Sequence, residues 1–116
     1  ALYYTLKALG KRVRVENEKA IPKKYRDLAP ALDELQREYF KNEKIFYYAK
    51  LCGMSESNFR KLFKEYTGKS PIEYRNLIRI TAVKTLLNTS ELTVSEAAYL
   101  VGFNNMSYFY EVYNKY

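Results

Sequence analysis

The chain has 116 residues with 20 Lys and Arg against 13 Asp and Glu, which gives a formal net charge of +7 and a pI near 9.4. Histidine is absent and cysteine occurs once, which excludes histidine-based triads, most zinc sites and an internal disulfide, and predicts a cytoplasmic protein. The positive charge fits an anionic partner, nucleic acid first and an acidic membrane surface second, and it fits an ordinary basic surface equally well. No apolar run approaches membrane-spanning length, so no membrane insertion is predicted.

Residues 1–24 are predicted to be the end of a preceding domain and a linker. Residues 1–10 carry leucines at helical spacing and finish with a glycine, a common helix stop. Residues 11–24 are polar and rich in lysine and arginine. We therefore expect the folded domain to span 25–116 and to begin with a helix that has Pro30 in its first turn. The apolar positions of that helix are Leu28, Leu32, Leu35 and Tyr39.

A pattern then occurs twice along the chain. The first copy, over about 44–66, consists of an apolar helix pattern, Gly53 as the turn residue, and a second helix that begins after Ser55, a good N-cap. The second copy, over about 93–116, has the same order, with Gly102 as its turn residue. Two amphipathic helices around a glycine turn are typical of a helix-turn-helix, whose second helix commonly enters the DNA major groove.

A longer helix over about 71–88 connects the two copies. It begins with a capping box in which Ser70 caps the helix and Glu73 reaches back to the cap. A second capping box, formed by Thr93 and Glu96, opens the second copy. No stretch alternates as a strand would, so the predicted fold class is all-α: two helix-turn-helix units joined by a long connecting helix.

The second helix of the first copy has an apolar face and a charged face. The apolar positions, predicted to point inward, are Phe59, Leu62, Phe63 and Tyr66. Three positive charges share the other face, where arginine can bond guanine with two hydrogen bonds and lysine can neutralise a phosphate. The outward positions are Ser57, Arg60, Lys61 and Lys64. We predict that this copy contacts DNA through Ser55, Ser57, Asn58, Arg60, Lys61 and Lys64.

The last helix, capped by Asn104 or Asn105, keeps the apolar face but not the positive charge. Its inward positions are Phe109, Val112, Tyr113 and Tyr116, and its outward positions are Ser107, Tyr110, Glu111 and Asn114. Glu111 stands where the first copy has Lys61, so attraction to phosphate is weaker here. We predict that this copy contacts DNA through Asn105, Met106, Ser107, Tyr110 and Glu111, with fewer or weaker base contacts than the first.

With these residues in place, residues 28–116 resemble the DNA-binding domain of the AraC/XylS family of bacterial transcription regulators. In the first copy the matching residues are Ser55, Phe59-Arg60-Lys61-Leu62-Phe63-Lys64 and Gly68. In the connecting helix they are Arg79, Ala82, Leu86 and Leu87. In the second copy they are Val101-Gly102-Phe103 and Ser107-Tyr108-Phe109.

The resemblance implies a homeodomain-like pair of helix-turn-helix units that inserts two helices into adjacent major grooves of double-stranded promoter DNA, roughly 34 Å apart. It also implies a separate sensing or dimerising domain outside this segment, and contact with RNA polymerase in members that activate transcription. No cofactor or metal is implied. The family continues with a closing Gly, Pro and Tyr-Arg segment, so we expect the C-terminus at Tyr116 to be truncated or disordered.

The sequence departs from the family pattern in several places. Glu111 stands where the family usually has a basic residue, and Tyr113-Asn114 replaces Phe-Lys. Tyr48 and Ala97 fill positions that are usually aliphatic, which affects packing more than function.

Three rival functions remain open from the residues alone. An enzyme has little support, because Cys52 is the only thiol and its place beside Gly53 suits a small core residue better than a nucleophile. A helical protein-interaction module is compatible with DNA binding. RNA binding requires exposed aromatic side chains on which bases stack, and Tyr108 and Tyr110 are the candidates.

Overall fold

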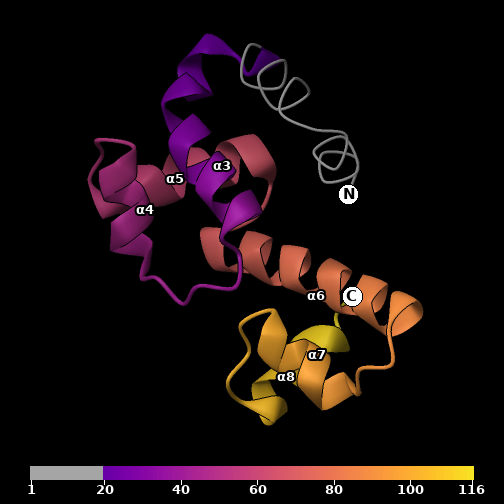
Figure 1. The fold of residues 1–116 in the computed structure, drawn as a ribbon. Coiled ribbons are helices and arrows are strands. Elements are labelled where there is room, and N and C mark those ends of the chain that lie inside the picture. Colours follow the sequence, from indigo (N-terminus) through magenta and orange to yellow (C-terminus); the bar gives the residue numbers. More distant parts are fainter. Residues whose placement is uncertain (1–19) are drawn as a thin grey trace.

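The computed structural model describes residues 20–116, and all the regular elements in that part are helical (Figure 1). The elements in chain order are the 3-10 helix η1 (Lys23–Leu28), α3 (Ala29–Arg37), α4 (Ile45–Leu51), α5 (Glu56–Thr67), α6 (Pro71–Thr89), α7 (Val94–Leu100) and α8 (Met106–Tyr113). The prediction of an all-α fold with two helix-turn-helix units and a long connecting helix is confirmed. The helix predicted over 1–10 lies outside the described residues.

The folded part begins before residue 25, so the linker predicted up to residue 24 is too long. Ile21 is buried in the core and η1 already begins at Lys23. A single isoleucine among lysines gives no periodic signal, which is why the sequence pattern did not mark it. The next helix matches its prediction, because Pro30 lies in the first turn of α3.

The first apolar core lies among η1, α3, α4 and α5, and Ile78 is the residue of α6 that is buried in it. The helices present their apolar faces to each other at the predicted spacing, as expected for amphipathic surface helices. The fully or nearly fully buried residues of this first core are Ile21, Leu28, Ala31, Leu32, Leu35, Ile45, Tyr48, Ala49, Phe59, Phe63 and Ile78. Tyr48, at a position where the related pattern is aliphatic, is thus a core side chain.

The second apolar core lies between α7, α8 and the C-terminal half of α6. It contains Ile80, Val83, Ala97, Ala98, Val101, Phe103, Phe109 and Val112. Ala97 and Ala98 are fully buried, and their small side chains allow α7 to approach α6 closely. Figure 1 shows α6 running from the α3–α5 group to the α7–α8 pair, so a single helix supports both units.

Both predicted capping boxes are present. The Ser70 backbone N–H donates to Glu73 Oε1 at 2.8 Å, and the Thr93 backbone N–H donates to Glu96 Oε1 at 2.8 Å. These backbone hydrogen bonds, followed by the side-chain ones, hold the pKa of both carboxyls below the usual value. Because the folded pKa is lowered, this contribution to stability is present above the ordinary carboxyl pKa and is lost as pH falls through the folded pKa.

The middle of α6 carries a buried polar layer that the sequence reasoning missed. Arg75, Asn76 and Arg79 are buried on the side where the two units meet. The signal available in the sequence was the i, i+4 spacing of two arginines in a helix whose neighbouring positions are apolar.

No helix among the described residues has the length and apolar character needed to cross a bilayer.

Candidate nucleic-acid interface

The first helix-turn-helix unit is closed by a tight backbone turn between α4 and α5. Gly53 adopts a positive φ of 65°, and the Met54 N–H donates to the Ala49 carbonyl at 3.0 Å. The Ser55 hydroxyl then caps α5 by accepting from the Asn58 backbone N–H at 3.3 Å. Ser55 therefore has a structural task in addition to its predicted contact with DNA.

Helix α5 presents the predicted polar face to solvent. Phe59 and Phe63 are fully buried and Leu62 is half-buried against the first core. The side chains of this helix that are predicted to contact DNA are all exposed, namely Ser57, Asn58, Arg60, Lys61 and Lys64. The helix thus buries its apolar face in the first core and leaves the opposite face exposed to a partner.

The positive charges on this face are partly paired with carboxylates. Arg60 Nη2 lies 2.9 Å from Glu56 Oε2, and Lys64 Nζ lies 4.0 Å from Glu73 Oε1. Within residues 20–116 Lys61 has no ion-pair partner. Exposed pairs of this kind are worth about 0–1 kcal/mol, so a phosphate or a base can replace the carboxylate at small cost.

The second unit repeats the backbone of the first. Gly102 has a positive φ of 112°, and the Phe103 N–H donates to the Ala98 carbonyl at 3.0 Å, as Met54 does to Ala49 in the first unit. The cap of α8 is Asn105, whose Oδ1 accepts from the Tyr108 backbone N–H at 2.9 Å. The side-chain oxygen of Asn105 is thereby occupied, while its amide nitrogen remains available as a donor.

Helix α8 buries Phe109 and Val112 and exposes a face with a single charge, Glu111. Its other exposed side chains among the predicted contacts are Ser107 and Tyr110. Met106 differs from them because it is half-buried against the second core. This face has no basic side chain, in contrast to the face of α5.

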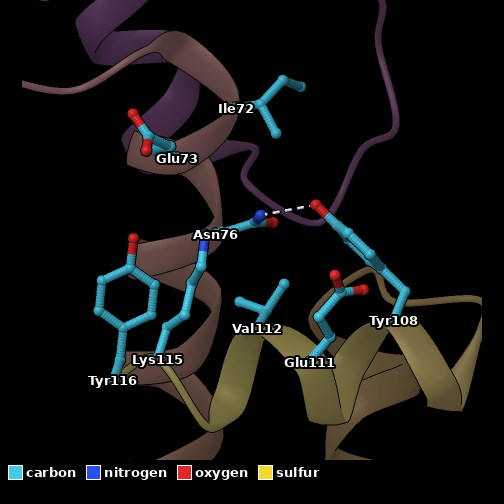
Figure 2. A pocket seen from close by; sticks show the side chains of 8 residues that line it. All are labelled: Ile72, Glu73, Asn76, Tyr108, Glu111, Val112, Lys115 and Tyr116. Carbon is cyan, nitrogen blue, oxygen red and sulfur yellow. Dashed lines mark hydrogen bonds between the residues drawn. The ribbon is translucent and has the colours of Figure 1, made fainter.

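A pocket of about 220 Å³ lies between the N-terminal half of α6 and α8 (Figure 2). Glu73, Glu111 and Lys115 line it, so its charge is mixed. Across it the Asn76 amide donates to the Tyr108 hydroxyl at 2.8 Å (Figure 2). Tyr108, one of the two aromatics considered for base stacking, is therefore held against α6.

Among the described residues no group of His, Cys, Asp and Glu side chains is arranged to hold a metal.

Two tyrosines predicted to point inward are exposed instead. Tyr66 is 36% exposed and Tyr116 is 38% exposed. Each follows the last buried residue of its apolar face, Phe63 or Val112, by about one helical turn and lies beyond the edge of the core. The Tyr66 ring packs on Tyr25 of η1, with the ring centroids 5.1 Å apart.

Cys52 packs beside the first core and is half-buried. Desolvation by burial raises the pKa of its thiol above the usual value. A raised pKa lowers the fraction of thiolate at neutral pH, which is the opposite of what a nucleophilic cysteine needs.

Comparison with known proteins assigns the chain to a family. The family described as "Helix-turn-helix domain" matches residues 48–116, more than half of the chain. An HTH-type transcriptional regulator of Haemophilus influenzae is 31% identical over 68 residues, which are 59% of this chain and 23% of that protein. The xylose operon regulatory protein of Escherichia coli is 26% identical over 85 residues, which are 73% of this chain and 22% of that protein.

The HTH-type transcriptional regulator GlxA of Rhizobium meliloti is 30% identical over 67 residues, 58% of this chain and 21% of that protein. The chain thus spans less than a quarter of the length of these relatives. The same fold occurs in the DNA-binding domain of the transcriptional factor AdpA, solved in complex with a target DNA, with a TM-score of 0.70 and 23% identity over 77% of this chain and 80% of that one. The chain therefore belongs to the AraC/XylS-type helix-turn-helix family, a family of DNA-binding transcription regulators and not of enzymes.

Proposed function

We propose that this chain binds duplex promoter DNA sequence-specifically and that α5 and α8 are its two reading helices. The observation that carries the proposal is the repeated unit, in which each second helix buries its apolar face and exposes the opposite face. A net charge of +7 provides the general attraction that such a protein needs toward phosphates. The DNA-binding domain in this proposal spans residues 21–116.

In this proposal α5 provides most of the affinity. Arg60 exchanges its Glu56 partner for the edge of a guanine, and Lys61 and Lys64 neutralise phosphates. The start of the helix, with Ser55, Ser57 and Asn58, meets base edges and a phosphate, which a helix N-terminus attracts through its free N–H groups. Because Arg60 is already held by a neighbour one turn away, its side chain is partly ordered before DNA arrives.

Helix α8 reads DNA more weakly in this proposal. Asn105, Met106 and Ser107 lie at its first turn, where base edges are met in a helix-turn-helix. Tyr110 and Glu111 follow one turn later, and Glu111 repels phosphate unless it accepts from a cytosine amino group. The half-burial of Met106 leaves part of its side chain for contact with a base.

Selection of bound sites from a random duplex library tests the proposal directly. We expect a consensus with two half-sites about one helical turn apart, roughly 34–36 Å, because two linked reading helices enter successive grooves. A parallel competition with single-stranded RNA tests the alternative of RNA binding. Recovery of no duplex consensus, together with tight RNA binding, would refute the proposal.

Two partners beyond DNA are also proposed. The first is a sensing or dimerising domain, supported by relatives more than four times as long as the matched segment. The second partner is RNA polymerase, and we place this interaction in the cytoplasm of a bacterium.

The surface of α7 is the proposed contact with RNA polymerase. It has a hollow of about 410 Å³ beside Tyr99 and Leu100, whose side chains are 67% and 60% exposed. Tyr99→Ala should leave duplex affinity unchanged and weaken capture of purified RNA polymerase; equal capture would contradict the second partner.

A further inference from the structure

The two units meet through a buried polar cluster at the middle of α6. The first core reaches α6 at Ile78 and the second reaches it at Ile80 and Val83. On the same helix the guanidinium of Arg79 is buried, and Arg79 as a whole is only 3% exposed. The contact between the units is therefore directional, because hydrogen bonds depend on angle whereas apolar packing does not.

Arg79 bonds to both units at once. Its Nε donates to the Tyr39 carbonyl at 2.7 Å and its Nη2 donates to the Lys41 carbonyl at 3.0 Å, both in the segment that leads from α3 into α4. Its Nη1 donates to the Gly102 carbonyl at 3.3 Å, in the turn of the second unit. A rigid planar fork that engages three carbonyls from two units fixes their relative orientation.

Asn42 closes the same cluster from the first unit. Its Oδ1 accepts from Arg79 Nη2 at 3.0 Å, and its Nδ2 donates to the Gly102 carbonyl at 3.0 Å. One exposed side chain thus connects the approach to α4 with the turn before α8. Asn42 belongs to none of the exposed faces proposed to contact DNA.

The two turn glycines differ in what surrounds them. A Cβ on Gly53 would meet nothing within 4 Å, whereas a Cβ on Gly102 would lie 2.7 Å from Arg79 Cζ and 2.7 Å from the Phe40 carbonyl oxygen. Gly53 is needed only for its backbone conformation. Gly102 is needed for its backbone conformation and also because any side chain at this position would collide with Arg79 and with the Phe40 carbonyl.

The charge of Arg79 is balanced by dipoles rather than by a carboxylate. Its hydrogen-bond partners are three backbone carbonyls and one amide oxygen. Burial, followed by the nearby charge of Arg75, lowers the pKa of Arg79 to about 10, so the side chain keeps its proton at neutral pH. A buried charge held in this way is costly to displace.

We propose that Arg79 and Asn42 are positioning residues that lock α5 and α8 into one relative placement and thereby restrict the spacing at which two DNA half-sites are read together. The statement about half-sites rests on the proposed function; the statement about the lock does not. A role in stability alone would change the unfolding transition without changing the placement of the units in the folded protein.

The lock is tested without DNA by measuring the distance between nitroxide labels at equivalent positions of the two units. The labelled chain carries Lys50→Cys and Tyr99→Cys, with Cys52→Ser to remove the native thiol. Because Asn42 is exposed, Asn42→Ala is expected to fold. The unaltered protein should give a single narrow distribution of label-to-label distances, and Asn42→Ala should broaden it. The matched control Asn88→Ala, on the exposed end of α6, should leave it narrow. Equal widths in Asn42→Ala, Arg79→Lys and the control would overturn the lock.

The consequence for DNA is tested with duplexes in which one base pair is inserted or removed between the half-sites. The unaltered protein should lose about tenfold in affinity at each altered spacing, because one base pair rotates the second groove away from α8. Asn42→Ala should lose less than about threefold, while Asn88→Ala behaves as the unaltered protein. The same tenfold loss in Asn42→Ala would overturn the spacing role. Absence of duplex binding by every protein would instead refute the proposed function and leave the distance measurement to decide on the lock.

Discussion

The two helix-turn-helix units share a backbone and differ in their surfaces. Both have a glycine with positive φ, a hydrogen bond of 3.0 Å across the turn and a side-chain cap on the second helix. The exposed face of α5 carries Arg60, Lys61 and Lys64, whereas that of α8 carries Glu111 as its only charge. Repetition of the motif therefore preserves the geometry for entering a groove without preserving the chemistry that binds phosphate.

The units also differ in what supports them. The first is covered by η1 and α3 in addition to α6, while the second packs α7 and α8 on α6. The glycine of the first turn is open and that of the second is enclosed by Arg79 and Phe40. Each unit therefore has a core of its own, and the turn of the second unit is in addition held against Arg79 and Phe40.

The largest expected effect comes from truncating the central aromatic of each core. Phe63→Ala and Phe109→Ala should each lower the free energy of unfolding by about 3–5 kcal/mol, because each leaves a cavity among fully buried neighbours. Denaturant unfolding measures the loss, and amide hydrogen exchange locates it. Exchange should accelerate mainly in the unit that carries the substitution. Equal acceleration in α4 and α7 from either variant would show that the units do not have separate cores.

Specificity should depend most on Arg60. Arg60→Ala is expected to cost about 1–3 kcal/mol at the selected site and to relax the preference at one base pair, because the bidentate contact with guanine is lost. Arg60→Lys is the control that retains the charge and loses the fork. Titration against a panel of single-base variants measures both. Uniform weakening across the panel would mean that Arg60 touches only phosphate.

Reversing the charge at position 111 should make the exposed face of α8 bind DNA more like that of α5. Glu111→Lys gives α8 the basic residue that α5 has in Lys61, so affinity for all duplexes should rise. The slope of log K against log salt should steepen by about one to two units. Glu111→Gln, which removes the charge without adding one, should give a smaller rise. A selective loss at one base pair would instead assign Glu111 to a cytosine.

A smaller effect is expected at Lys64. Lys64→Ala should reduce the salt slope by about one unit or less, because Lys64 divides its charge between a phosphate and Glu73, 4.0 Å away. Thermal stability should hardly change, since the pair is exposed. Binding titrations at several salt concentrations measure the slope. If slope and affinity both stay the same, Lys64 lies outside the interface.

The elements with local signals were predictable from sequence. The caps at Ser55, Ser70 and Thr93 bond to backbone groups three residues away, so a short stretch of sequence contains the whole interaction. The repeat then identified two units, and the apolar spacing identified Phe59, Phe63, Phe109 and Val112 as core residues.

The contacts between units were not predictable in the same way. Arg79 bonds to three backbone carbonyls and the Asn42 amide oxygen, which lie 23 to 40 residues away along the chain, so no short stretch of sequence contains the interaction. Arginine is seldom buried, so its burial has no sequence signal of its own. The pair between Glu56 and Arg60 has i, i+4 spacing and therefore does have a local sequence signal, and it offsets part of the positive charge of the exposed face of α5.

We expect the first unit to supply most of the affinity of this chain for DNA. Footprinting of Arg60→Ala and Tyr110→Ala, which occupy equivalent positions on α5 and α8, tests it on one duplex site. Arg60→Ala should weaken protection over both half-sites, whereas Tyr110→Ala should weaken only the half-site read by α8. Equal loss over both half-sites from both variants would contradict the claim.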